Sequence, residues 1–339
     1  MNDSRIINKP IVAIDLFCGA GGSSYGARLA GVQLVAAFDM WQRAVATYNA
    51  NFGNIAQCED IREVDPESLK AEIGQIDLIM ASPECTNHSR AKGKGERCET
   101  SRDTAFEVIR FASVFLPRWI VIENVVEMRQ WSRYQELKER LKELGYDCVE
   151  EELNAQDFGV PQSRRRLFLI CSKEARPEVV ASNETLLTPA RTIISDNGYR
   201  LSPLRSEKRA KATLAKVDYA IAKLKEEDAL EPFLIVYYGS AKDGGSGGWQ
   251  SLDKPLRTIT TLDRFGYVIP GKTREDERMR MLQPSELKRA MGYGDDFQFA
   301  EEVTRRDKIK LMGNGVCPPV MKAIVSSLIK DANGFQVES

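Results

Sequence analysis

The sequence predicts an α/β fold, a doubly wound and mostly parallel sheet with helices on both faces. Apolar runs of strand length alternate with segments of helix length through the first half of the chain. The run at residues 11–17 leads directly into glycine-rich sequence, which is typical of a buried parallel strand. Three predicted helices end at a glycine, namely Gly31, Gly53 and Gly74.

The individual elements follow from the same alternation. Strands are predicted at residues 11–17, 32–38, 55–58, 76–80 and 119–122, followed by a late strand pair at 148–153 and 167–171. Helices are predicted at residues 24–30, 41–51 and 66–73, in further segments up to residue 144, and at 318–329.

The pattern changes near residue 173. A long lysine-rich helix is predicted at residues 208–227, and residues 237–249 contain five glycines, which indicates a flexible loop. We therefore expect a catalytic domain formed by residues 1–172 and 252–339, interrupted by a small insert at residues 173–251.

Composition excludes several classes of protein. The 339 residues are 42% hydrophobic and 29% charged, as in a globular enzyme, and no apolar run approaches the length of a membrane span. The N-terminus is polar and gives no secretory signal. The seven cysteines are irregularly spaced without a C-x-x-C pair, and His88 is the only histidine. We expect a cytoplasmic protein without a zinc site or disulfide framework.

The charge pattern contains one local basic stretch. The formal net charge is −1, but residues 198–217 carry one acidic side chain against six basic ones. These are Arg200, Arg205, Lys208, Arg209, Lys211 and Lys216. The stretch is either a nucleic-acid-binding face or a solvated helix surface, and charge alone does not choose between them.

The first motif is Asp-Leu-Phe-Cys-Gly-Ala-Gly-Gly at residues 15–22. Its glycines allow a tight turn and a close approach of the backbone to a ligand, at the edge where a doubly wound sheet binds cofactors. It is not G-x-G-x-x-G, so it favours a small zwitterionic cofactor over a dinucleotide. A plain strand-to-helix turn is the alternative.

Acidic residues follow the second and third predicted strands. Asp39 is placed to accept ribose hydroxyls and Met40 to pack on an adenine. Asp60 offers a carboxylate to an exocyclic amine, next to the apolar Ile61. Each could be an ordinary loop residue, but their order on successive strands favours a nucleoside.

Cys85 follows the fourth predicted strand, where α/β enzymes place reactive groups. A free cysteine is usually a small buried apolar residue, but Glu84, Asn87 and His88 are too polar for that environment. Residues 90–100, rich in lysine, glycine and arginine, are predicted to form a loop that can close over a substrate.

The fifth strand ends at Glu123, and alternation places Arg164 and Arg166 on one face of a later strand with Arg165 on the other. Two arginines near a strand-end carboxylate predict an anion-handling site. A surface salt-bridge cluster is the alternative.

Together these motifs resemble the cytosine-C5 DNA methyltransferase family over nearly the whole chain. The resemblance is carried by residues 15–22, by Cys85 with Ser89, by Glu-Asn-Val at 123–125, by Gln162, Arg164 and Arg166, by Arg-Thr-Ile-Thr at 257–260 and by Gly-Asn-Gly-Val at 313–316. The sequence departs from the family at Glu84, where proline usually precedes the cysteine, and at Thr86 and His88.

The resemblance implies a Rossmann-like class I methyltransferase with a small target-recognition insert. Cys85 would attack C6 of cytosine, Glu123 would bind N3 as a protonated acid, and Arg166 would bind O2 with support from Arg164. S-adenosyl-L-methionine is the implied cofactor, bound by Phe17, Cys18, Gly19, Ala20, Gly21, Gly22, Asp39, Met40, Asp60, Ile61, Pro83, Asn314 and Val316.

The implied partner is double-stranded DNA with a flipped base, without a metal or a membrane, and a monomer is compatible with the sequence. The residues expected on nucleic acid are Ser89, Lys92, Lys94, Arg97, Lys208, Arg209, Lys211 and Thr260. Two alternatives stay open. One is a tRNA cytosine-C5 methyltransferase, although the Cys-Phe-Thr of that branch is replaced here by Cys-Thr-Asn. The other is a catalytically silent DNA-binding subunit.

Overall fold

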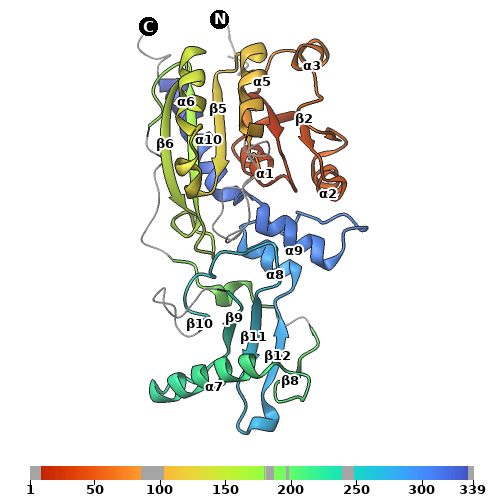
Figure 1. The fold of residues 1–339 in the computed structure, drawn as a ribbon, viewed down its shortest axis with the longest axis vertical. Helices are drawn as coiled ribbons and strands as arrows, with labels where there is room; N and C mark the ends of the chain where they lie inside the picture. The colour runs from red at the N-terminus through yellow and green to blue at the C-terminus, as the bar shows by residue number, and fades with distance from the viewer. Residues whose placement is uncertain are drawn as a thin grey trace, which may run out of the picture.

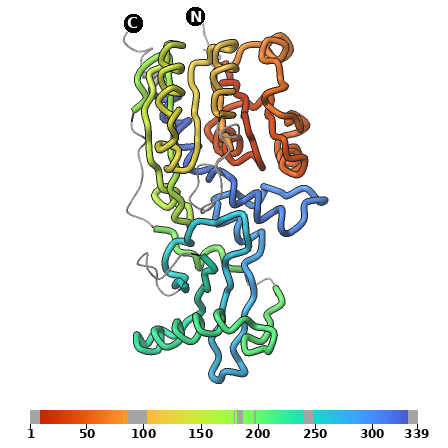
Figure 2. The backbone as a smooth tube through the Cα atoms, in the orientation of Figure 1, coloured from red at the N-terminus to blue at the C-terminus, as the bar shows by residue number. Residues whose placement is uncertain are grey.

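The computed structural model describes residues 9–84, 103–178, 180, 187–195, 198–238 and 248–334. Figure 1 shows two lobes, the larger built around a seven-stranded sheet and the smaller around a five-stranded sheet. Figure 2 shows that the chain returns from the small lobe to the large one before it ends, so that the N- and C-termini lie at the same end of the molecule.

The large sheet confirms the predicted α/β class. Its order is β3-β2-β1-β4-β5-β7-β6, with β7 antiparallel to both of its neighbours and the other pairs parallel. Its strands are β1 (Val12–Leu16), β2 (Gln33–Asp39), β3 (Ala56–Cys58), β4 (Leu78–Ala81), β5 (Trp119–Asn124), β6 (Asp147–Asn154) and β7 (Arg165–Ser172). The chain leaves β1 first toward β2 and later toward β4, so the strand order switches there and opens a crevice at the carboxyl ends.

Helices cover both faces, as predicted. Along β4, Leu78 and Met80 face one apolar core while Ile79 and Ala81 face the other, as the two-residue repeat of a strand requires. The helices of this lobe are α1 (Gly22–Leu29), α2 (Gln42–Phe52), α3 (Pro66–Ile73), α5 (Glu107–Phe115), α6 (Tyr134–Glu143), α8 (Pro284–Ala290), α9 (Arg305–Asn314) and α10 (Pro318–Gly334). No helix in the described ranges is long and apolar enough to cross a membrane.

The small lobe is an antiparallel sheet in the order β10-β9-β11-β12-β8. Its strands are β8 (Ser202–Pro203), β9 (Phe233–Val236), β10 (Trp249–Ser251), β11 (Phe265–Ile269) and β12 (Arg278–Met281). Helix α7 (Lys211–Glu226) confirms the predicted lysine-rich helix and packs Val217, Ala220 and Leu224 on one face of the sheet. The other face, with Leu234 and Val236, joins the core that includes α10.

The predicted boundary of the insert is wrong at its C-terminal end. Strands β11 and β12 follow residue 251, yet they pair with β9 and β8 at the centre of the small sheet. The sequence pattern hid this because the two strands are short and are separated from β9 by a glycine-rich stretch. Most of that stretch, residues 239–247, lies outside the described residues.

Close contact between α1 and α10 holds the C-terminal segment against the crevice. A Cβ on Gly26 would lie 2.4 Å from the carbonyl oxygen of Pro318, and one on Gly22 would lie 2.2 Å from that of Val316. Only glycine allows the backbone of α1 to approach the segment that carries Asn314 and Val316.

We expect Gly26→Ala to lower the free energy of unfolding by about 1–3 kcal/mol, because the new methyl group meets backbone that cannot move aside. The sign is informative, since alanine in a helix is ordinarily more stable than glycine. Leu29→Ala, at an exposed position on the same helix, is the control and should change stability by less than about 0.5 kcal/mol. Denaturant unfolding measures both; a neutral or stabilising Gly26→Ala would contradict the role of this contact.

Candidate active site

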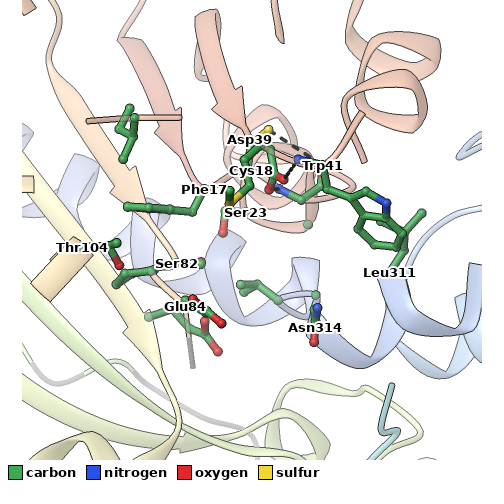
Figure 3. A pocket seen from close by; sticks show the side chains of 18 of the residues that line it. Phe17, Cys18, Ser23, Asp39, Trp41, Ser82, Glu84, Thr104, Leu311 and Asn314 are labelled. Carbon is green, nitrogen blue, oxygen red and sulfur yellow. Dashed lines mark hydrogen bonds between the residues drawn. The ribbon is translucent and has the colours of Figure 1, made fainter. Parts of the chain in front are cut away.

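A cavity of about 440 Å³ lies at the carboxyl ends of the parallel strands, a size typical of small-molecule sites. Figure 3 shows the side chains that line it, from Asp39 and Trp41 on one side to Glu84 on the other. The walls come from the turns after β1 and β2, from residues 59–62 after β3, from residues 82–84 after β4, from β5 and β7, and from α9 with its C-terminal turn.

Asp39 holds the turns after β1 and β2 at one end of the cavity. Its Oδ2 accepts a hydrogen bond from the backbone N–H of Gly19 (2.9 Å) and its Oδ1 one from that of Trp41 (2.8 Å). Burial raises the pKa of Asp39, while these two N–H donors act in the opposite direction. Phe17, Cys18, Gly19 and Gly22 line the cavity as predicted.

Ala20 and Gly21 are not among the lining residues. Gly21 has φ +89°, and a Cβ there would lie 2.6 Å from the ring of Phe52 and 3.0 Å from that of Tyr48. The structure therefore explains this glycine by its packing against α2, and not by the predicted contact between backbone and ligand.

Met40, Asp60 and Ile61 also line the cavity. The Arg62 guanidinium donates to both carboxylate oxygens of Asp60 and holds the pKa of that carboxyl below its usual range. Lys310 lies over the Trp41 ring, 4.2 Å from its centroid.

Sequence reasoning missed several lining residues. They are Ser23, Trp41, Arg62, Ser82, Thr104, Lys310 and Leu311. Helical spacing could have found two of them, because Lys310 and Leu311 precede Asn314 by one turn of α9.

Glu123 and Arg166 form an ion pair at the other end of the cavity. Arg166 Nε lies 3.1 Å from Glu123 Oε1, and the Glu123 side chain is 7% exposed. Burial raises the pKa of Glu123 above its usual value, although Arg166 and Arg164 oppose the shift. Pro83 lines the same space, and its carbonyl accepts a hydrogen bond from Asn124 Nδ2 (3.1 Å). Cys85, Ser89, Lys92, Lys94 and Arg97 lie outside the described residues.

Arg164 does not line the cavity, which corrects the predicted pairing of two arginines at an anion site. Its side chain is buried and donates to the carbonyls of Ile259 (3.0 Å), Gly313 (2.7 Å) and Gly315 (2.9 Å). It thereby positions the turn that carries Asn314 and Val316, both of which line the cavity. Arg165 points away, as predicted, and pairs with Glu152.

The basic stretch of the small lobe is divided by its contacts. Arg205 pairs with Asp218 and Glu277, and Lys216 donates to the carbonyl of Val236. Arg209 donates to Ser202 Oγ, whereas Lys208 and Lys211 are exposed near the start of α7. Figure 1 shows α7 at the end of the small lobe remote from the seven-stranded sheet. Thr260, also predicted on nucleic acid, donates its hydroxyl to the carbonyl of Leu262 and does not line the cavity.

Within the described part of the chain, no group of three or more histidine, cysteine or acidic side chains could hold a metal ion.

The sheet order and the position of the cavity define a class I methyltransferase fold.

Comparison with known proteins gives the family. A model described as C-5 cytosine-specific DNA methylase matches residues 11–330, so the chain belongs to this family of DNA (cytosine-5) methyltransferases. The Type II methyltransferase M.HindV of Haemophilus influenzae is 28% identical, over 93% of this chain and 95% of that protein. M.DdeI of Desulfomicrobium norvegicum is 36% identical over 53% of this chain and 44% of its own length. Among solved structures, S. pombe Dnmt2 has a similar fold, with a TM-score of 0.66 at 19% identity, over 96% of this chain and all of that one.

The buried carboxyl of Asp15 lies next to the glycine-rich turn that follows β1. Asp15 is inaccessible to solvent, and its Oδ2 accepts a hydrogen bond from Ser24 Oγ (2.6 Å), which in turn accepts one from Tyr48 (2.8 Å). Its Oδ1 has no hydrogen-bond partner among the described residues. Burial raises the pKa of Asp15 to about 7, and the nearby Asp39 adds to the shift.

This raised pKa makes stability depend on pH. Asp15 ionises near pH 4 in the unfolded chain and near pH 7 in the folded chain. Its contribution to the free energy of unfolding is therefore complete below pH 4 and is lost as the pH rises to 7. We expect the free energy of unfolding of Asp15→Asn to rise by about 2–4 kcal/mol relative to that of the wild type as the pH increases from 4 to 7. Above pH 7 the difference should stay constant. Unfolding free energies of the two proteins across this range give the slope, and parallel curves would contradict the assignment.

Proposed function

We propose that this protein transfers a methyl group from S-adenosyl-L-methionine to C5 of cytosine in double-stranded DNA, through a covalent bond between Cys85 and C6 of a flipped base. The observation that carries the proposal is the single cavity that joins Asp39 and Asp60 to the Glu123–Arg166 pair. A nucleoside cofactor and a reacting base can therefore occupy neighbouring ends of one site.

The lining residues suit the cofactor. The Asp39 carboxylate would accept hydrogen bonds from ribose hydroxyls and Asp60 one from an exocyclic amine, while Met40, Trp41 and Ile61 would pack on an adenine ring. The turn at residues 17–19 and Asn314 also line the cavity and suit the amino-acid portion. When bound, the cofactor supplies an electrophilic methyl group on a sulfonium.

The chain's own residues would activate the base. Cytosine C5 is a poor nucleophile, and attack of the Cys85 thiolate on C6 makes C5 enamine-like. Glu123, whose pKa is raised by burial, would in its protonated form donate to N3 and offset charge that develops on the ring. Arg166 would donate to O2 and hold the ring plane. Transfer would form the C5–methyl bond as the sulfonium–methyl bond breaks. A water molecule or His88 would then take the C5 proton, the C5–H electrons would form the C5–C6 double bond, and the Cys85–C6 bond would break with return of its electrons to sulfur.

Cys85→Ser should abolish methyl transfer and leave cofactor affinity unchanged, because the weaker nucleophile removes only the covalent step. Cytosine fluorinated at C5 should trap a protein–DNA adduct with the wild type, since a fluorine cannot leave as the proton does.

Glu123→Gln should lower kcat about 10²- to 10⁴-fold. Cys148→Ser, on β6, is the matched control. Radiolabelled methyl transfer to DNA and tRNA, measured side by side, provides the readout.

The outcomes separate the alternatives. Transfer to tRNA alone would overturn DNA as the substrate. Cofactor and DNA binding without any transfer would mark a silent DNA-binding subunit. The Type II relatives suggest a prokaryotic or phage restriction-modification or defence system, and bisulfite sequencing of DNA from expressing cells would give the target sequence.

We propose further that the small lobe reads the DNA and that Lys208, Arg209 and Lys211 contact phosphates. Changing all three to glutamine should weaken binding to every DNA sequence alike and flatten its salt dependence, because fewer counterions are released. Changing Lys223 and Lys225 to glutamine, at the other end of α7, removes two positive charges from the same helix; it is the control and should have little effect.

Grafting the lobe into a relative of known specificity tests which residues read the sequence. The graft should extend to residue 282, because the small sheet is completed only by β12. A chimera that keeps the recipient's specificity would place recognition elsewhere, first of all in residues 90–100.

A further inference from the structure

The departure at Glu84 lies inside the cavity. Glu84 is an exposed residue that lines the cavity together with Glu123 and Arg166. The preceding residue, Pro83, accepts a hydrogen bond from Asn124 at its carbonyl. Figure 3 shows its carboxylate on the side opposite Asp39 and Trp41. A family position usually occupied by an uncharged proline therefore presents a negative charge here.

The position of Glu84 relative to the bound cofactor follows from the two ends of the cavity, and this step rests on the proposed function. The adenosine end is marked by Asp39, Asp60 and Ile61, so the sulfonium must lie toward Glu123 and Arg166 for its methyl group to reach the base. Glu84 lines this end and precedes the nucleophile in the sequence. Its carboxylate is thus nearer the sulfonium than the adenine.

Charge in the cavity already favours a cation. Among the described lining residues, and leaving aside Glu123, which acts in its protonated form, four side chains are acidic (Asp39, Glu59, Asp60 and Glu84) and three are basic (Arg62, Arg166 and Lys310). The methyl donor carries a positive sulfonium that its thioether product lacks, so a carboxylate at this end distinguishes the two by charge.

We propose that Glu84 is a specificity-determining residue that favours the cationic methyl donor over its neutral product. It would thereby relieve product inhibition. Two opposite unit charges several ångströms apart in a partly hydrated site predict a preference of roughly three- to ten-fold. The attraction is screened by salt, because the cavity is open to solvent.

The experiment measures equilibrium binding of three ligands to the full chain, using the fluorescence of Trp41 in the cavity wall. The ligands are S-adenosylmethionine, S-adenosylhomocysteine and an analogue with a protonated amine in place of the sulfonium. We expect Glu84→Gln to reduce the preference for both charged ligands over S-adenosylhomocysteine by roughly three- to ten-fold. Glu84→Asp should keep most of the preference, and Glu84→Pro, which restores the family residue, should behave like Glu84→Gln.

Glu59→Gln is the matched control, because Glu59 lines the adenosine end of the same cavity. It should change the affinities for S-adenosylmethionine and S-adenosylhomocysteine by the same factor. An unchanged ratio in Glu84→Gln, with S-adenosylmethionine still bound, would overturn the role of Glu84 and leave the proposed function intact. A wild-type protein that binds none of the three ligands would instead overturn the proposed function. Circular dichroism of each variant verifies the fold.

Discussion

The geometry of this molecule depends on one buried cation. Arg164 lies at the start of β7, where its guanidinium donates to the carbonyls of Ile259, Gly313 and Gly315. Those carbonyls belong to two segments 95 to 151 residues further along the chain. A buried guanidinium is costly unless its donors are satisfied, and the backbone carbonyls satisfy its two terminal nitrogens only if both segments are in place. The requirement therefore fixes the C-terminal turn against the sheet.

Gln162 extends the same junction. Its side chain, which is not exposed, donates to the carbonyl of Ala290 and accepts from the N–H of Ile259. A Cβ on Gly313 would lie 2.4 Å from the carbonyl carbon of Thr260, so the segments meet backbone against backbone. Of the Gln-x-Arg-x-Arg motif, Gln162 and Arg164 join the parts of the molecule, and Arg166 alone lines the cavity.

Local sequence was sufficient for much of the fold and for the outline of the site. Strands β1, β2, β4, β5 and β7 of the large sheet are mostly apolar, so their bounds were predictable to within a few residues. Helix α3 was predicted at its observed bounds with Gly74 as its stop, and the structure adds Asp65 as its N-terminal cap. Asp39, Asp60 and Glu123 were found because strand ends meet at one edge of the sheet.

The remaining features depend on contacts that sequence spacing does not encode. Alternation correctly separated Arg165 from its neighbours but did not show that Arg164 would enter a buried junction. The lining residues Arg62, Thr104 and Lys310 come from separate segments that only the fold brings together. The small sheet was missed because β8 has two residues and β10 three, too few to show a period.

Both faces of the sheet in the small lobe are covered by other parts of the molecule. Helix α7 covers one side of its sheet, and on the other side Leu234, Val236 and Phe265 belong to the core of the catalytic lobe. These inward positions cannot change without disturbing the packing between the two lobes, whereas loops and outer edges can. If the small lobe reads DNA as proposed, a change of target sequence would have to come from these loops and edges, and it would leave the catalytic residues untouched.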